Sequence, residues 1–152
     1  MQMKRIWNKP TTLLTVLFSW ILIMTSCESE LSNGDLDGMW RLDKIAYNNG
    51  DEIACSNLYY VIYHKLIELA WRPEDKRPGQ EMTYYMGRFN HTGDSLYIHD
   101  FRYYRDEENK VTLDDLSRFG LQSEETRFQV VTLNRSHMTL KAPHATFYFR
   151  KF

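Results

Sequence analysis

Apolar and polar side chains alternate along most of the chain after residue 38, which is typical of β-strands that place one face in a core. The alternation holds around Trp40 and Leu42 and then shifts phase to reach Ile45. Turn sequences such as Asn-Asn-Gly-Asp and His-Thr-Gly-Asp separate successive apolar runs. The pattern predicts strands over residues 39–47, 58–71, 83–90, 95–102, 126–133, 136–142 and 145–152.

The stretch over residues 58–71 (LYYVIYHKLIELAW) is the least certain in type, because it is apolar on both parities and periodicity does not separate strand from helix. Its Tyr, Val and Ile content favours one long strand. We expect a bulge in this strand where Lys65 and Glu68 would otherwise interrupt an apolar face.

One short helix is predicted over residues 113–119. Thr112 is a suitable N-cap, acidic residues occupy the first turn, and Gly120 follows the last turn. Leu113, Leu116 and Phe119 would share one face of this helix.

Seven or eight strands, each expected to lie beside the strand that follows it in the chain, predict an all-β fold. We expect an up-and-down antiparallel β-barrel of about eight strands, with the short helix as its only one. An open β-sandwich is the alternative architecture.

The first residues have the features of an export signal. Lys4, Arg5 and Lys9 precede an apolar stretch over residues 13–24 (LLTVLFSWILIM). As a helix it would cover roughly 18 Å, which is short of the ~30 Å hydrocarbon core of a bilayer. A cleaved signal peptide is therefore a better interpretation than a permanent span.

Thr25 and Ser26 precede Cys27, and this sequence resembles a bacterial lipobox. The resemblance implies cleavage before Cys27 and attachment of lipid to its thiol, while an ordinary signal peptide with an incidental cysteine is the alternative. The predicted organisation is a signal peptide over 1–26, a polar tether over 27–37 and a barrel domain over 38–152. We expect an outer-membrane lipoprotein of the cell envelope, on the periplasmic or the surface face.

Composition excludes several classes of protein. A charged fraction of 26%, a hydrophobic fraction of 43% and a net charge of -1 are those of a globular domain, and no basic run suggests a nucleic-acid partner. Cys55 would be the one unmodified cysteine, so no intramolecular disulfide is expected. We expect it to be a buried small apolar side chain rather than a reactive thiol.

Catalytic and metal sites find little support. His64 and Glu68 would lie ~13 Å apart along a strand, too far to bind one metal ion. The paired carboxylates stand in turn-like or helix-start sequences, and the chain lacks a nucleophile elbow, a P-loop and a dinucleotide-binding glycine pattern. We therefore expect no enzyme activity, no metal and no cofactor.

The segment over residues 36–42 (LDGMWRL) carries the Gly-x-Trp of the opening lipocalin strand, with Trp40 placed to plug one barrel end. The stretches 87–96 (GRFNHTGDSL), 112–116 (TLDDL) and 147–151 (FYFRK) are similar to small lipocalin-like lipoproteins of Bacteroidetes. The resemblance implies a lipid-anchored lipocalin-like barrel without a settled activity. Asp94-Ser95-Leu96 also resembles the O-glycosylation acceptor of that phylum, which implies a sugar on Ser95.

We expect a monomer that binds a small hydrophobic or amphipathic molecule inside the barrel. A filled-core structural or protein-interaction module of the envelope, with no ligand and an unknown protein partner, is the alternative. The expected ligand-lining side chains are the aromatic residues Trp40, Tyr60, Tyr85, Phe89, Phe128 and Phe147.

Overall fold

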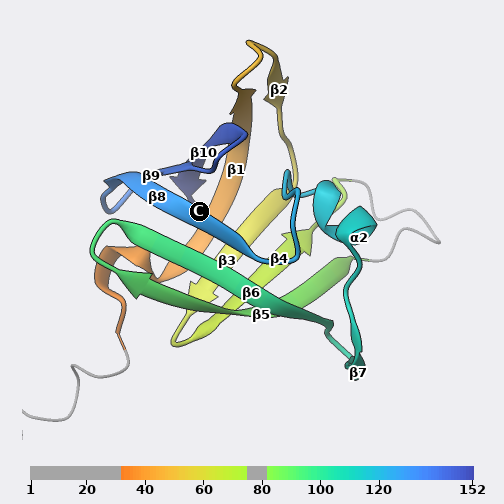
Figure 1. Cartoon of the computed structure of the whole chain (residues 1–152). Helices are drawn as coiled ribbons and strands as arrows, with labels where there is room; N and C mark the ends of the chain where they lie inside the picture. Colours follow the sequence, from red (N-terminus) through yellow and green to blue (C-terminus); the bar gives the residue numbers. More distant parts are fainter. Residues whose placement is uncertain (1–31, 75–81) are drawn as a thin grey trace, which may run out of the picture. The chain divides into compact units, whose positions relative to one another are not determined.

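The structure is a computed structural model that describes residues 32–74 and 82–152 (Figure 1). Strands make up most of this part of the chain, as the alternating pattern predicts. The elements are η1 (Gly34–Leu36), β1 (Gly38–Tyr47), β2 (Glu52–Ala54), β3 (Leu58–Tyr63), β4 (Leu66–Trp71), β5 (Thr83–Thr92), β6 (Ser95–Tyr103), β7 (Asp106–Lys110), α2 (Leu113–Ser117), β8 (Thr126–Leu133), β9 (His137–Lys141) and β10 (Ala145–Lys151).

The strands form a closed antiparallel barrel. Pairing follows the order β1, β3, β4, β5, β6, β8, β9 and β10, and β10 returns to pair with β1. These eight strands close the ring within the described residues, which confirms the predicted barrel and excludes the open sandwich. β2 and β7 are additional short strands, paired with β1 and β6, that the sequence pattern did not predict.

The phase shift in the first strand is a β-bulge. The register of β1 against β10 changes between Leu42 and Lys44, so Trp40, Leu42 and Ile45 all point into the barrel. Asp43 occupies the bulge, where its carboxylate accepts a hydrogen bond from Nε of Arg41 at 2.9 Å. The bulge lets a strand with an interrupted alternation keep its apolar side chains on one face.

The prediction of one long, bulged strand over residues 58–71 is wrong, because this segment is the hairpin of β3 and β4, which pair without a register shift. Tyr63 pairs with Leu66, and His64 takes the left-handed backbone conformation with φ 55°. The segment is apolar on both parities because it contains two strands of this barrel rather than one. The turn between them lacks the Gly or Asn that usually announces such a conformation.

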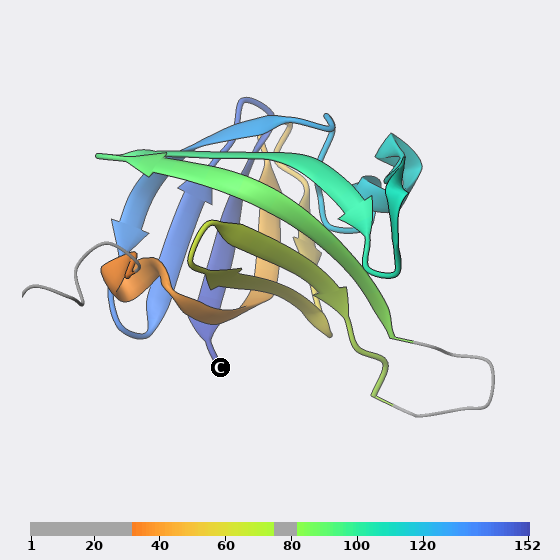
Figure 2. The same ribbon diagram turned by 90° about the horizontal axis from the view of Figure 1, so that it is seen from below.

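The two ends of the barrel are covered differently (Figure 2). η1 lies at one end, where the buried Leu36 accepts a hydrogen bond through its carbonyl oxygen from Nε1 of Trp40 at 2.8 Å. α2 lies towards the opposite end in both views (Figures 1 and 2). Residues 34–36, which lie within the predicted tether, therefore form a short helix with a buried side chain against the barrel.

The predicted helix is confirmed in place but is shorter than expected. α2 ends at Ser117, and the chain continues through hydrogen-bonded turns to Gly120. Leu116 and Phe119 are fully buried, whereas Leu113 is 43% exposed, so the predicted three-residue apolar face is wrong at its first member. A membrane-spanning helix would need a longer apolar run than any helix in residues 32–74 and 82–152 provides.

Candidate functional site

The six aromatic residues expected to line a ligand cavity all lie in the barrel core. Tyr85 is the most exposed of them, at 6%. Their rings pack against other side chains, with ring centroids 4.9 Å apart for Tyr60 and Phe149 and 5.2 Å apart for Phe128 and Phe147. The middle of the barrel is therefore filled by side chains. The six residues are Trp40, Tyr60, Tyr85, Phe89, Phe128 and Phe147.

The segment after α2 closes the barrel from one end. Phe119 is fully buried, and its carbonyl oxygen accepts a hydrogen bond from the Tyr60 hydroxyl at 2.7 Å. The next carbonyl oxygen, that of Gly120, lies 2.9 Å from Nε2 of His144. Two side chains far away in the chain, one from β3 and one from the β9–β10 turn, thus fasten the backbone of this segment over the core.

Gly120 is required where it stands. Its φ of 83° is a conformation that side chains with a Cβ rarely adopt. A Cβ at this position would also lie 2.4 Å from Cδ1 of Ile45 and 2.7 Å from the Phe147 ring. A residue without a side chain is what lets the segment run so close to the barrel wall.

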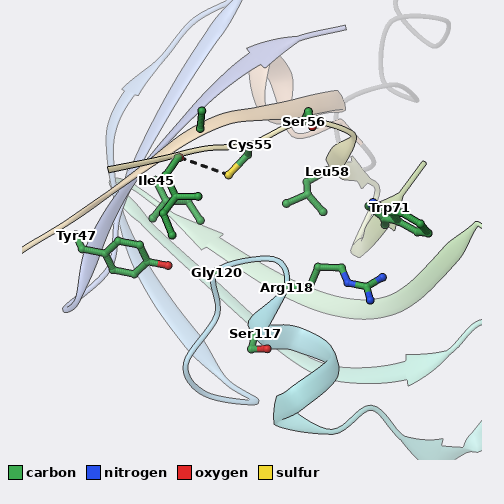
Figure 3. Close-up of a pocket in the computed structure, with 11 residues that line it drawn as sticks. Ile45, Tyr47, Cys55, Ser56, Leu58, Trp71, Ser117, Arg118 and Gly120 are labelled. Atoms are coloured by element: carbon green, nitrogen blue, oxygen red, sulfur yellow. Dashed lines mark hydrogen bonds between the residues drawn. The ribbon is translucent and has the colours of Figure 1, made fainter. Parts of the chain in front are cut away.

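A pocket of about 410 Å³ lies beside this segment (Figure 3). Side chains of β1, β3 and β4 line one part of it, and the end of α2 lines another. The pocket lies towards the α2 end of the barrel, which we call the barrel mouth. Its lining residues are Ile45, Tyr47, Ile53, Ala54, Cys55, Ser56, Leu58, Trp71, Ser117, Arg118 and Gly120.

The mouth pocket combines apolar walls with one cation. Ile45, Leu58 and Trp71 supply apolar surface, and the guanidinium carbon of Arg118 lies 5.0 Å from the centroid of the Trp71 ring. No carboxylate among the described residues forms an ion pair with Arg118. This arrangement suits a molecule with an apolar body and an anionic or polar head.

Cys55 contributes a neutral thiol to the pocket. Burial raises the pKa of this thiol above its ordinary value, which disfavours the thiolate. Its backbone N–H donates to the carbonyl oxygen of Asp43 in the β1 bulge at 2.9 Å. Because the thiolate is the reactive form, a thiol kept neutral by burial is a poor nucleophile and a poor metal ligand.

Asp115 fixes α2 to the barrel beside the mouth. Its carboxylate accepts hydrogen bonds from the hydroxyls of Tyr85 at 3.1 Å, Tyr103 at 2.7 Å and Thr112 at 2.6 Å. Burial alone would raise the pKa of Asp115, but hydrogen bonds from Thr112, Tyr103 and Tyr85 outweigh it and lower this pKa to about 2. Burial and the bond to Asp115 raise the pKa of Tyr85 to about 12.

The other residues singled out in the sequence lie elsewhere. Ser95 begins β6, partly buried, and its hydroxyl oxygen accepts from Nη1 of Arg127 at 3.5 Å. Cys27, the predicted lipid attachment site, lies outside the described residues. No group of three or more His, Cys, Asp or Glu side chains in the part of the chain described here is placed to hold a metal ion.

Trp71 and Arg118 could not be predicted from the sequence as members of one site. They belong to β4 and to the end of α2, and only closure of the barrel brings them together. The one available signal was the N-cap residue Thr112, which predicts a helix just before Arg118. It does not predict which strand lies next to that helix.

A family model described as a lipocalin-like domain matches residues 22–152. A comparison with curated proteins finds no match.

Two solved structures resemble the fold. The crystal structure of a lipocalin-like protein from Bacteroides uniformis superposes with a TM-score of 0.62 at 23% identity, covering 78% of this chain and 100% of that one. An uncharacterized protein from Bacteroides eggerthii superposes with a TM-score of 0.60 at 17% identity, covering 76% of this chain and 98% of that one. At these identities the likeness extends to the fold alone.

Proposed function

The chain belongs to the family of lipocalin-like domains, and we propose that it is a lipid-anchored envelope protein that binds a small amphipathic molecule at the barrel mouth. The mouth pocket of about 410 Å³ is the observation that carries the proposal, since small-molecule sites range from about 300 to 1,000 Å³. Its position differs from the sequence-based expectation of a ligand deep among the core aromatics.

The pocket chemistry supports an amphipathic ligand rather than a purely apolar one. The apolar part would lie against Ile45, Leu58 and Trp71, and the head group would meet the guanidinium of Arg118. A hydrogen bond from a guanidinium to an anion is about twice as strong as one between neutral groups. Arg118 would therefore select ligands with an anionic head.

The N-terminal sequence supports the anchor. The basic residues before the apolar stretch of residues 13–24, and the small residues before Cys27, are those of a lipoprotein signal. Two or three acyl chains on Cys27 would hold the protein on a membrane durably, and the outer membrane is the proposed location. Cys27→Ala should yield an unprocessed or unanchored protein on membrane fractionation.

Native mass spectrometry of the protein purified from its own host tests the ligand. We expect a bound small molecule, and dodecanoate as a probe should bind the wild type. Arg118→Gln should weaken dodecanoate binding by about tenfold, because one charge-assisted contact is lost. Arg127→Gln is the matched control, since this arginine also lies over an aromatic ring, that of Tyr97 at 5.2 Å, but outside the pocket.

Equal binding by both arginine variants would contradict the assigned head-group site. A protein that carries no small molecule from its host and takes up no probe would contradict the binding function itself.

The packed interior favours a second candidate function, an interaction module without a ligand. Trp40, Tyr60 and Phe119 are fully buried and leave the middle of the barrel occupied. This function predicts a protein partner whose capture survives Ser56→Trp, a substitution that fills the mouth pocket from its rim. Loss of the partner in this variant would favour the mouth as the functional site.

A further inference from the structure

The first and the last residues of the described barrel domain both lie at the η1 end of the barrel. Nδ2 of Asn33 donates to the carbonyl oxygen of His64, in the β3–β4 turn, at 2.8 Å. At the other end of the chain, the backbone N–H of Phe152 donates to the carbonyl oxygen of Met39 at 2.8 Å. The β3–β4 turn, the first strand and the last residue therefore lie beside the point where the chain leaves Asn33 towards its N-terminus.

Large apolar side chains are exposed at this end. Tyr63 is 62% exposed, Leu66 is 39% exposed and Phe152 is 74% exposed. The core does not need Tyr63 and Leu66, because the neighbouring residues Ile62 and Ile67 already supply the inward side chains of the hairpin and are buried. Tyr63 and Leu66 instead face each other across the turn on the outside of the barrel.

We infer that the η1 end of the barrel rests on the lipid surface to which the chain is anchored, with Tyr63, Leu66 and Phe152 in the interfacial layer. The inference rests on the lipid anchor at Cys27 in the proposed function. Five residues lie between Cys27 and Asn33, and an extended chain over these six Cα–Cα steps reaches roughly 20 Å. The anchored barrel therefore stays close to the bilayer, and the η1 end is the end that the tether holds nearest to it.

The chemistry of the patch fits a lipid interface. Aromatic rings with a polar group, such as the Tyr63 phenol, favour the head-group level of bilayers. Charge adds little, because the basic Lys65 and Lys151 at this end are accompanied by the acidic Asp35 and Asp37. The contact would therefore depend on apolar area, and the mouth pocket at the opposite end would face the aqueous phase.

Spin labels on the acylated full protein in phosphatidylethanolamine–phosphatidylglycerol vesicles test this orientation. Cys55→Ser with Lys65→Cys leaves one thiol for labelling at the β3–β4 turn, because acylated Cys27 is blocked. The matched label at Asn49→Cys stands in the β1–β2 turn at the opposite end (Figure 1). We expect collisions with a water-soluble nickel reagent to fall several-fold for the label at position 65 and to stay unchanged at position 49.

Serine variants then identify the contact. Tyr63→Ser with Leu66→Ser should restore access of nickel to the label at position 65 while the protein stays membrane-bound through Cys27. Tyr104→Ser with Leu113→Ser removes an equally exposed aromatic and leucine pair near the mouth and should restore nothing. Far-ultraviolet circular dichroism verifies that every variant retains its strands.

The outcomes separate the two proposals. A protein that is not acylated at Cys27 overturns the anchor, and the docking surface with it. An acylated, membrane-bound protein whose two labels are equally accessible to nickel overturns the docking surface alone. Protection at position 65 that survives the Tyr63 and Leu66 substitutions overturns the assigned contact.

Discussion

Asp115 concentrates several stabilising contacts in one carboxylate. It completes the capping box of α2, with Thr112 as its N-cap, and it also accepts from Tyr85 and Tyr103 of the barrel wall. The same side chain therefore starts the helix and fastens it to β5 and β6. Because these bonds require the charged form, they lower the pKa of Asp115 from 3.8 to about 2 against the opposing effect of burial.

Replacing Asp115 should change how stability depends on pH. Because the folded-state pKa is depressed, the stabilisation is complete above pH 3.8 and is lost as pH falls towards 2. Asp115→Asn should lower the free energy of unfolding by about 1 kcal/mol at neutral pH, as loss of a helix cap does. Urea denaturation between neutral pH and pH 2 should show this difference shrinking towards zero.

Asp114→Asn is the control, since the Asp114 carboxylate accepts none of these hydrogen bonds. A difference between wild type and Asp115→Asn that stays constant down to pH 2 would show that the carboxylate charge is not what fastens the helix.

At the scale of elements, the β3–β4 hairpin shows how a turn can escape sequence analysis. His64 adopts φ 55° without being Gly or Asn, so the turn has no compositional signal. Asn33 compensates from outside the hairpin by donating to the His64 carbonyl oxygen. A contact between residues so far apart in the chain holds the turn, and local propensity cannot reveal it.

Two substitutions at His64 should shift stability in opposite directions. His64→Asn should raise the free energy of unfolding by a few tenths of a kcal/mol, because Asn tolerates left-handed backbone. His64→Val should lower it by about 1–2 kcal/mol, since a β-branched residue resists that conformation. Urea midpoints measure both changes, and equal shifts for the two variants would contradict the role of backbone strain.

Most elements could be predicted from the sequence where the alternation is clean. The strands containing Phe89, Phe128 and Phe147 lie where the pattern places them, and even the phase shift before Ile45 corresponds to a real bulge. β2 and β7 could not be predicted, because β2 is only three residues long and β7 is the polar run DEENK. Both segments become strands by pairing with β1 or β6, and the side-chain pattern does not reveal that pairing.

At the scale of the whole molecule, closure of the barrel decides where a ligand can bind. The alternation of side chains predicts which aromatic residues point inward. It does not predict whether they line a cavity or fill the interior, because that depends on how far opposite walls of the barrel approach each other. Phe119 occupies the space next to the mouth pocket and is held by the bond from Tyr60 to its carbonyl oxygen. The candidate site is therefore shallower than the fold alone would suggest.

Removing the Phe119 ring should deepen the mouth pocket. Phe119→Ala should lower the free energy of unfolding by about 3–5 kcal/mol through the cavity it leaves. The new space adjoins the pocket, so anilinonaphthalene sulfonate should bind the folded variant more strongly than it binds the wild type. Fluorescence titration below the unfolding transition measures this gain.

Phe89→Ala removes an equally large buried ring away from the mouth and should lose similar stability without gaining dye. Comparable dye binding by both variants would mean that the gain reflects general loosening and not a deeper mouth.

The pairing of β10 with β1 also affects how closely spaced copies of the protein would interact. With the proposed lipid anchor, copies of the protein would share a two-dimensional membrane surface, where neighbours collide far more often than the same number of molecules in solution. An open sheet in that setting would present unpaired N–H and C=O groups on which a neighbour's strand could add. Along the described ring those groups are already engaged within one molecule, so dense packing on a membrane need not seed intermolecular sheets.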